Sequence, residues 1–433
     1  MVSSSPPRRA VGVPPAAVTS RRNEGIVAVH AEEAAFLWTQ RSHATEAPHY
    51  SLLDLARLDE RVEAHVDGLR LGGEVAADCC RENLANGAGP GEVFALAVLA
   101  FSLDQRELML EALQVGCRSA RLRRGLESAL GWLNYDAVST WIRRLHEAKL
   151  PIHRAVGLAA AALHRRDPGQ ALRAAIDDQD ADLRSRALRA VGELGRTDLL
   201  GAVLDHAQEE HEECRFWAAW SAVLLGHQGG VTMLASFVER PGPFTDRALA
   251  LLLRAFPLEE SRRWISLLAQ DPTRLRSAIV ATGVLGDPLS VPWLIRRMEV
   301  PEHARLAGEA VTLITGADLE RLRLDADVSL PDDADVEAGG MRASEYDENL
   351  PLPSAARVSE WWEQNQGAFS SGVRYLAGKP IDKISLREVL ARGRQRARAA
   401  AAIELAVREP QQGLFNVRDR ALRQERRVAG APV

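Results

Sequence analysis

The chain has 433 residues, of which 46% are apolar, 26% are charged and only 5% are aromatic. This length exceeds the roughly 250–300 residues that one hydrophobic core serves, so several domains or a repeat array are expected. The net charge of −5 disfavours nucleic acid and anionic lipid as partners of the whole surface. A composition rich in Ala, Leu and Arg favours helix, and it disfavours a disulfide scaffold, a coiled-coil rod and a β-sandwich.

The first 22 residues read as a disordered tail. They hold four arginines and no acid, and two Pro-Pro pairs interrupt them. Because Pro14-Pro15 breaks the only apolar stretch after Arg8-Arg9, the segment does not resemble a secretory signal. The four cysteines show no CxxC spacing, and no run approaches the ~18 apolar residues of a membrane span. We therefore expect a cytoplasmic protein without a membrane partner.

Residues 23–73 are predicted to form an N-terminal helical cap. The segment from Leu52 to Leu71 has the pattern of one amphipathic helix, and Gly72-Gly73 ends it.

A helical pattern that ends in Leu-Gly, followed by a polar turn and a second apolar run, recurs over residues 74–318. Counting from the cap, nine positions in this phase are separated by 30 to 32 residues: Gly72, Asp104, Asn134, His164, Gly195, Gly226, Phe256, Gly286 and Gly316. Five of them are glycine, and the phase holds with other residues at the remaining four. A residue just past a helix often takes the left-handed conformation that glycine allows. Since one helix pair cannot bury both of its sides, stacking is required. The prediction is an all-α fold, an α-solenoid of antiparallel helix pairs, with a non-repetitive bundle as the alternative.

An acidic linker is predicted over residues 319–353. Nine acids and one base lie between Asp325 and Glu348. The alternating acids do not form a calcium loop, because Ala338 stands where such a loop needs glycine. We interpret the segment as solvated, with four of its acids as candidate partner-binding residues: Asp332, Asp333, Asp335 and Glu337.

The C-terminal segment, residues 354–433, is predicted to be helical over 354–366 and over 385–408. Ser385 is the expected N-cap of the second helix, with four arginines spread round its solvated surface: Arg392, Arg394, Arg396 and Arg398. The last ten residues look frayed. Trp361 and Trp362 complete the partner-binding candidates, because adjacent residues of a helix point about 100° apart and one partner rarely buries both.

Two further patterns resemble chemical sites. The cluster from His206 to Cys214 resembles a zinc motif, but its histidines are five residues apart, and we interpret it as a solvated turn. Trp217 and Trp220 lie three apart on one helix, near Arg215. Helical DNA glycosylases built from similar repeats use aromatic and basic residues in a concave groove, although inter-repeat packing explains these two tryptophans more simply. We predict no catalytic, cofactor-binding or metal-binding residues.

The Leu-Gly-Asp-Pro turn at 285–288, with the Arg/Ala helix before it, resembles a HEAT-like repeat. The whole chain also resembles an uncharacterised HEAT-repeat family of proteobacteria. The segments that carry this resemblance are 30–38 (HAEEAAFLW), 55–69, 314–319, 374–380 and 400–405. The family implies a fold but no established activity. Its members often occur beside type VI secretion components, which suggests an accessory role.

The leading hypothesis is a non-enzymatic protein-binding scaffold or adaptor. Its concave face, made by the second helix of each pair, would hold a protein partner such as a secretion effector or spike component. The alternative is a HEAT-like nucleic-acid-binding protein of the DNA glycosylase type, which requires a basic, aromatic-lined groove with a carboxylate. A lyase-like assembly factor is a third reading that no residue favours.

Overall fold

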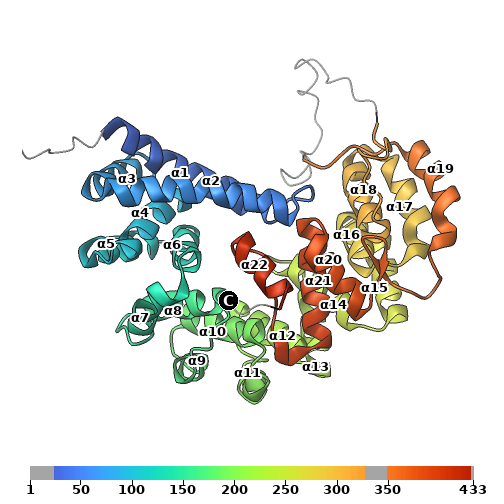
Figure 1. Cartoon of the computed structure of the whole chain (residues 1–433). Coiled ribbons are helices and arrows are strands. Elements are labelled where there is room, and N and C mark those ends of the chain that lie inside the picture. The colour runs from blue at the N-terminus through green and yellow to red at the C-terminus, as the bar shows by residue number, and fades with distance from the viewer. Residues whose placement is uncertain (1–23, 327–348, 431–433) are drawn as a thin grey trace, which may run out of the picture.

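The computed structural model describes residues 24–326 and 349–430. Within these ranges the fold is all-α, with 22 α-helices and one hairpin whose two strands have two residues each. Figure 1 shows the helices winding into a curved array, so the predicted α-solenoid is confirmed. The predicted tail and the four acids of the linker lie outside the described residues: Asp332, Asp333, Asp335 and Glu337.

An antiparallel pair of long helices opens the array. These are α1 (Glu24–Ala44) and α2 (Leu52–Gly72), each of 21 residues. Ser51 caps α2 by accepting a hydrogen bond from the Asp54 amide, and the Asp54 side chain accepts from the Ser51 amide in return. The predicted helix from Leu52 to Leu71 is therefore present, and α1 packs along it.

Two layers of helices follow. The outer helices are α3 (Glu74–Asn86), α5 (Arg106–Gly116), α7 (Tyr135–His146), α9 (Gln170–Ile176), α11 (Leu200–Asp205), α13 (Gln228–Glu239), α15 (Leu258–Gln270) and α17 (Val291–Met298). The inner helices are α4 (Pro90–Ser102), α6 (Ala120–Trp132), α8 (Pro151–Leu163), α10 (Ala181–Leu194), α12 (Glu212–Leu224), α14 (Thr245–Ala255), α16 (Leu275–Leu285) and α18 (Pro301–Thr315). Each inner helix packs against the next inner helix, which makes the layer continuous.

The sequence of each layer explains its position. Inner helix α4 buries ten of its 13 residues, because neighbours cover it on several sides. Outer helix α7 buries only Val138, Ile142 and Leu145, which form one stripe at spacings of four and three.

The repeat period predicted from the sequence matches the helix ends. All nine predicted positions coincide with the last residue of α2 or lie one or two residues beyond an inner helix. Gly195, Gly226, Gly286 and Gly316 have positive φ angles of 66°, 83°, 77° and 73°. These values are those of the left-handed cap that was expected.

One prediction about the layers was wrong. In the pairs read from the sequence, the first helix ends at the Leu-Gly position, and the second helix was expected to form the concave face. The structure places the first helices in the inner layer (Figure 1). These helices are richer in alanine, and the small side chain allows the close approach that the inside of a curve requires.

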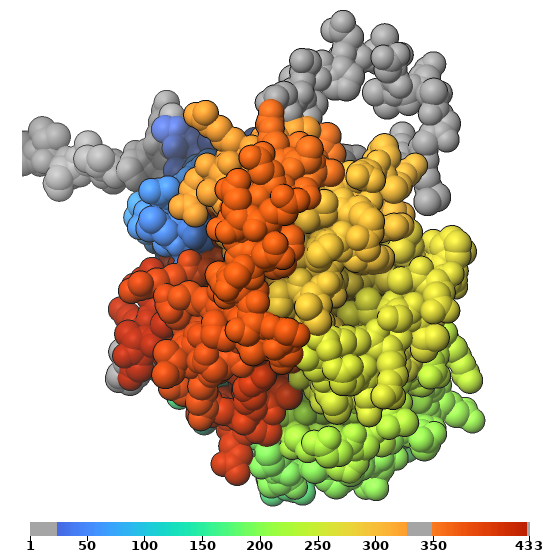
Figure 2. Space-filling model, turned by 90° about the vertical axis from the view of Figure 1, so that its right-hand side faces the viewer, coloured from blue at the N-terminus to red at the C-terminus, as the bar shows by residue number. Residues whose placement is uncertain are grey.

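The C-terminal segment does not simply extend the array. Helix α19 (Ala355–Asn365) packs on α17, and the chain then turns through β1 (Tyr375–Leu376) and β2 (Lys379–Pro380). Helices α20 (Lys383–Arg392), α21 (Gln395–Arg408) and α22 (Ala421–Val428) lie inside the curve of the solenoid (Figure 1). In Figure 2 these residues cover one side of the later repeats.

Three expectations for this segment were wrong. The single helix predicted over 385–408 is broken at Gly393, and Asp382 rather than Ser385 caps α20. The Asp382 side chain accepts hydrogen bonds from the amides of both Ile384 and Ser385. The helix therefore begins at Lys383, closer to the N-terminus than expected. The last ten residues, predicted to be frayed, include the end of α22, which packs against α2 and α20 and buries Ala421 and Gln424.

Candidate functional site: inner helix ends, C-terminal strap and arginine cavity

The carboxyl ends of the inner helices form a row of backbone acceptors. The last carbonyls of a helix have no partner within it, and they need donors from elsewhere. The structure supplies these donors from residues 409–430, which we call the C-terminal strap, and from the β1–β2 hairpin.

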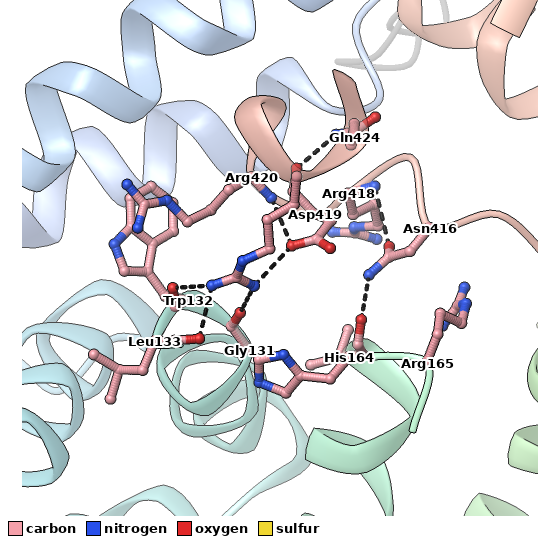
Figure 3. Close-up of polar contacts among 12 residues, drawn as sticks. Gly131, Trp132, Leu133, His164, Arg165, Asn416, Arg418, Asp419, Arg420 and Gln424 are labelled. Carbon is pink, nitrogen blue, oxygen red and sulfur yellow. Dashed lines mark hydrogen bonds and ion pairs between the residues drawn. The ribbon is translucent and has the colours of Figure 1, made fainter. Parts of the chain in front are cut away.

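Arg423 of the strap binds the end of α6. Its guanidinium donates hydrogen bonds to the carbonyl oxygens of Gly131 at 2.6 Å, Trp132 at 2.5 Å and Leu133 at 2.7 Å. Figure 3 shows these three residues facing the strap. Asp419 holds the same guanidinium in place at 3.0 Å. One side chain therefore satisfies three helix-end acceptors.

The strap continues over the ends of α8 and α10. The Asn416 side chain donates to the Leu163 carbonyl at 2.9 Å, and Arg427 donates to the His164 carbonyl at 3.1 Å. The Leu414 amide donates to the Glu193 carbonyl at 3.0 Å. The strap runs antiparallel to the order of the repeats, because its later residues meet the earlier helices.

Buried titratable groups line this contact. Burial lowers the pKa of His164 to about 4, and its Nε2 lies 2.9 Å from the Leu130 carbonyl. Glu193 is also buried, which alone would raise its pKa, but nearby arginines, Arg186 and Arg189 foremost, lower that pKa to about 2. The imidazole is therefore held neutral and the carboxylate charged at neutral pH.

The hairpin binds the later helix ends in the same way. Arg374 donates to the Leu285 carbonyl at 2.7 Å, and the Tyr375 amide donates to the Gly286 carbonyl at 2.7 Å. The Ala377 amide donates to the Leu313 carbonyl at 2.6 Å.

A buried carboxylate anchors α21 beneath the hairpin. Glu404 is 1% exposed and accepts a hydrogen bond from Arg374 at 2.6 Å. Arg254 of α14 and Arg408 surround the same carboxylate. Burial lowers the pKa of Arg254 to about 10, and Glu404 opposes that shift.

The two ends of the chain meet at Arg41 and Asp59. Arg41 of α1 pairs with Asp59 of α2 at 2.7 Å, and both side chains are buried. The remaining nitrogens of Arg41 donate to the carbonyls of Arg418 and Asp419, each at 2.7 Å. The Ala421 amide donates to Asp59 at 2.6 Å. The strap thus joins the first helices to the rest of the array.

The loop between α1 and α2 makes a second closure. The Gln395 amide donates to the Tyr50 carbonyl at 2.8 Å, and Arg394 donates to the His49 carbonyl at 2.8 Å. Arg394 also pairs with Asp318 at 2.6 Å, just beyond α18. The first and last parts of the solenoid are therefore bridged.

Of the four arginines that we predicted on a solvated helix, Arg392 and Arg394 are exposed, Arg396 is partly exposed and Arg398 is buried. Arg394 and Arg396 bind the chain's own acids and carbonyls, as described for Arg394. Arg398 is fully buried, and its guanidinium donates to Leu390, Gln395 and Gln424. The prediction of a solvated surface was wrong at Arg398, because that face of the segment is folded against the rest of the chain.

A partly enclosed cavity of about 170 Å³ lies between α1, α6 and the strap. We call it the arginine cavity. Five arginines and two acids contribute to its walls: Arg41, Arg124, Arg189, Arg418, Arg420, Glu127 and Asp419. Two tryptophans, Trp38 and Trp132, complete the walls. Sequence reasoning missed these residues, because they come from helices far apart in the chain and form no local motif.

The tryptophans near the cavity are covered. Trp132 is 3% exposed, and Arg420 and Arg41 lie over its ring at 4.8 and 5.6 Å. Trp217 is 5% exposed, and Arg189 and Arg247 lie over it at 4.7 and 5.7 Å. Neither ring presents a free face.

The predicted site residues that the structure describes lie elsewhere. Trp362 is buried between α17 and α19, 5.3 Å from Phe369, while the neighbouring Trp361 is partly exposed. Trp217 and Trp220 pack edge to face at 5.3 Å within the repeat core. His206 lies in the turn before α12 and contacts Asp177 and Glu209. In the described ranges, no group of three His, Cys, Asp or Glu residues is arranged to hold a metal ion.

The helical layers place the repeats in a known class. Residues 169–254 match the family model for HEAT repeats. The match covers α9 to α14, where the Leu-Gly period is clearest. No curated protein sequence matches the chain. None of the helices described is long and apolar enough to cross a membrane.

Proposed function

We propose that the protein is a non-enzymatic scaffold or adaptor that holds a protein partner. HEAT-type solenoids offer long, repetitive surfaces on which one chain can lie along many helices. The match to HEAT repeats over residues 169–254 supports this class of function. An accessory role in type VI secretion, with an effector or spike component as the partner, rests on the family resemblance of the sequence.

The observation that carries the proposal is the way the strap is bound. A segment of 22 residues, 409–430, which includes helix α22, lies across the ends of α6, α8 and α10 through backbone carbonyls and a few arginines. This inner row is therefore a surface that can hold a peptide segment with both irregular and helical parts. We propose that the partner provides a similar segment and competes with the strap for the row.

The experiment is affinity purification from native-host lysate at two salt concentrations with three forms of the chain. One is the natural sequence, and one is a loosened-strap variant with R423Q and R427Q. The third is the matched control R426Q, which changes an exposed arginine of the same helix α22. Competition predicts that the loosened strap captures more of one stoichiometric protein, while R426Q captures as much as the natural chain. Equal capture by all three forms would contradict the competition.

The nucleic-acid alternative has one observation in its favour, which is the arginine-rich inner cavity beside two tryptophans. Stacking on bases requires an open aromatic face, however, and the rings of Trp132 and Trp217 are buried under arginines. The geometry supports the protein scaffold better. Single-stranded DNA retained at low salt and lost at high salt, with no protein captured, would reverse this order.

A further inference from the structure

We propose that the arginine cavity is a binding site for a small polyphosphate, one ligand held jointly by the inner helices and the C-terminal strap. This inference is independent of the protein-scaffold function. It rests on the convergence of guanidinium groups from both ends and the middle of the chain around one cavity.

The cavity walls carry a surplus of positive charge. Four of the five lining arginines have an acid within ion-pair distance: Arg41 with Asp59, Arg189 with Glu193, Arg418 with Glu46 and Arg420 with Glu63. Arg124 of α6 has no ion pair or hydrogen bond among the described residues. Of the two lining acids, Asp419 is engaged by Arg423 and Arg427, and Glu127 lies 3.8 Å from Arg123.

A further arginine stands next to this group. Arg247 of α14 lies over Trp217 beside Arg189, and it forms no ion pair within the part of the chain described. Loss of water and the nearby Arg189 lower the pKa of Arg247. The surrounding protein, Arg189 and Arg41 likewise lower the pKa of Arg418, although 49% of its side chain still reaches solvent. An anion between these groups would relieve their mutual repulsion.

The size and geometry of the cavity favour phosphate. By the usual space that a buried water needs, a volume of about 170 Å³ holds roughly a dozen waters. This room suits a diphosphate or triphosphate and is too small for a helix or a nucleic-acid duplex. Guanidinium groups bind phosphate oxygens with paired, charge-assisted hydrogen bonds, and several of them approaching from different helices match a tetrahedral polyanion.

The site also joins separate parts of the fold. Arg41 comes from α1, Arg124 from α6 and Arg189 from α10, while Arg418 and Arg420 come from the strap. A ligand that bridges these groups binds only the closed arrangement, so it stabilises the strap against the array.

The test is calorimetric titration of the full chain at constant ionic strength with inorganic pyrophosphate and, separately, with ATP. We expect one binding site per chain for both probes. R124Q and R418Q should each weaken binding about tenfold, because each removes one charge-assisted contact. The matched control R263Q changes an exposed arginine of outer helix α15 and should leave the affinity unchanged.

The two probes distinguish the source of the phosphate. Similar affinities would identify the oxyanion as the recognised group, and tighter binding of ATP would extend the site to a nucleoside. Binding of ATP without pyrophosphate would overturn the proposal, and so would equal losses in R263Q and R124Q. Circular dichroism shows whether each variant is folded. We expect R124Q to fold as the natural chain does, because the Arg124 side chain is exposed.

Discussion

The repeat array and the C-terminal strap are held by different kinds of interaction. In the array, inner helices such as α4 bury nearly all their residues in apolar contact with the next repeat. In the strap, Arg423, Asn416 and the Leu414 amide bind backbone carbonyls, beside a smaller apolar contact made by Leu414, Phe415, Val417 and Ala421. The array is thus stabilised by buried area, which is spread over many residues, and the strap by a few polar groups.

This difference has a consequence for stability. Apolar packing tolerates substitutions that conserve volume, because the neighbouring side chains of the repeat keep most of their contacts. A buried guanidinium that loses its partner leaves several unpaired groups at once. Single substitutions in the strap and its anchors should therefore have larger effects than their small number suggests.

The largest effect is expected from removing the strap. A chain that ends at Arg408 leaves the carbonyls at the ends of α6 and α8 without their donors. The Arg41–Asp59 pair also loses its hydrogen bonds to the strap. We expect the free energy of unfolding to fall by about 5 kcal/mol or more, measured by chemical denaturation. A chain that lacks only residues 431–433 is the control. Equal denaturation midpoints for the two chains would show that the strap contributes no stability.

The second effect tests the single anchor at the chain ends. R41M leaves Asp59 charged and buried, and it removes two hydrogen bonds to the strap. We expect a loss of about 3–5 kcal/mol. The control R57M removes the exposed pair of Arg57 and Asp54, at 3.5 Å, and should cost less than about 0.5 kcal/mol. A cost for R41M as small as that of R57M would refute the anchoring role.

The third effect is a pH dependence at the strap contact. His164 has a folded pKa of about 4 against 6.5 when unfolded, so the unfolded chain binds the extra proton between these values. Stability from this group is therefore present above pH 6.5 and is lost as the pH falls toward 4. The full loss is about 3 kcal/mol for a shift of this size.

The measurement is the free energy of unfolding between pH 7 and pH 4. H164Q should flatten this dependence, because glutamine does not titrate. The exposed His43 provides the control, and H43Q should keep the slope of the natural chain. The same slope in H164Q and in the natural chain would mean that His164 is not held neutral by the fold.

The smallest effect compares two glycines. Gly286 has a φ of +77°, and an added Cβ would collide with the Tyr375 carbonyl oxygen of the hairpin. Gly201, in outer helix α11, has open space around the same position. G286A should destabilise the protein by about 1–3 kcal/mol, whereas G201A should stabilise it by about 0.5–1 kcal/mol. Thermal denaturation of both variants measures the two changes in stability. Changes of the same sign in G286A and G201A would contradict the prediction.

The same comparison explains what the sequence could predict. The array follows from a period, since helix ends recur every 30 to 32 residues and all but the first, which ends α2, mark an inner helix. The choice of which helix lies inside was wrong, because both helices of a pair carry an apolar stripe. Alanine content at α8 and α12 is the signal that could have decided it.

The strap and the cavity could not be predicted in this way. Arg423 and Gly131 are 292 residues apart, and the acceptor is a backbone carbonyl that every residue has. Arg124 and Arg418 likewise belong to no local motif. Asp332, Asp333, Asp335 and Glu337 stay a prediction, as do Trp361 and Trp362, although the burial of Trp362 leaves Trp361 the more accessible of the two.

The most direct test of the account is amide hydrogen exchange of the intact chain over residues 409–430. The Leu414 amide donates to the Glu193 carbonyl, and the Ala421 amide donates to Asp59. If the strap closes the array, these two amides should exchange at least ~100-fold more slowly than those of an unstructured peptide. Exchange of both amides at the unstructured rate would contradict the closed arrangement, and with it the cavity that the strap completes.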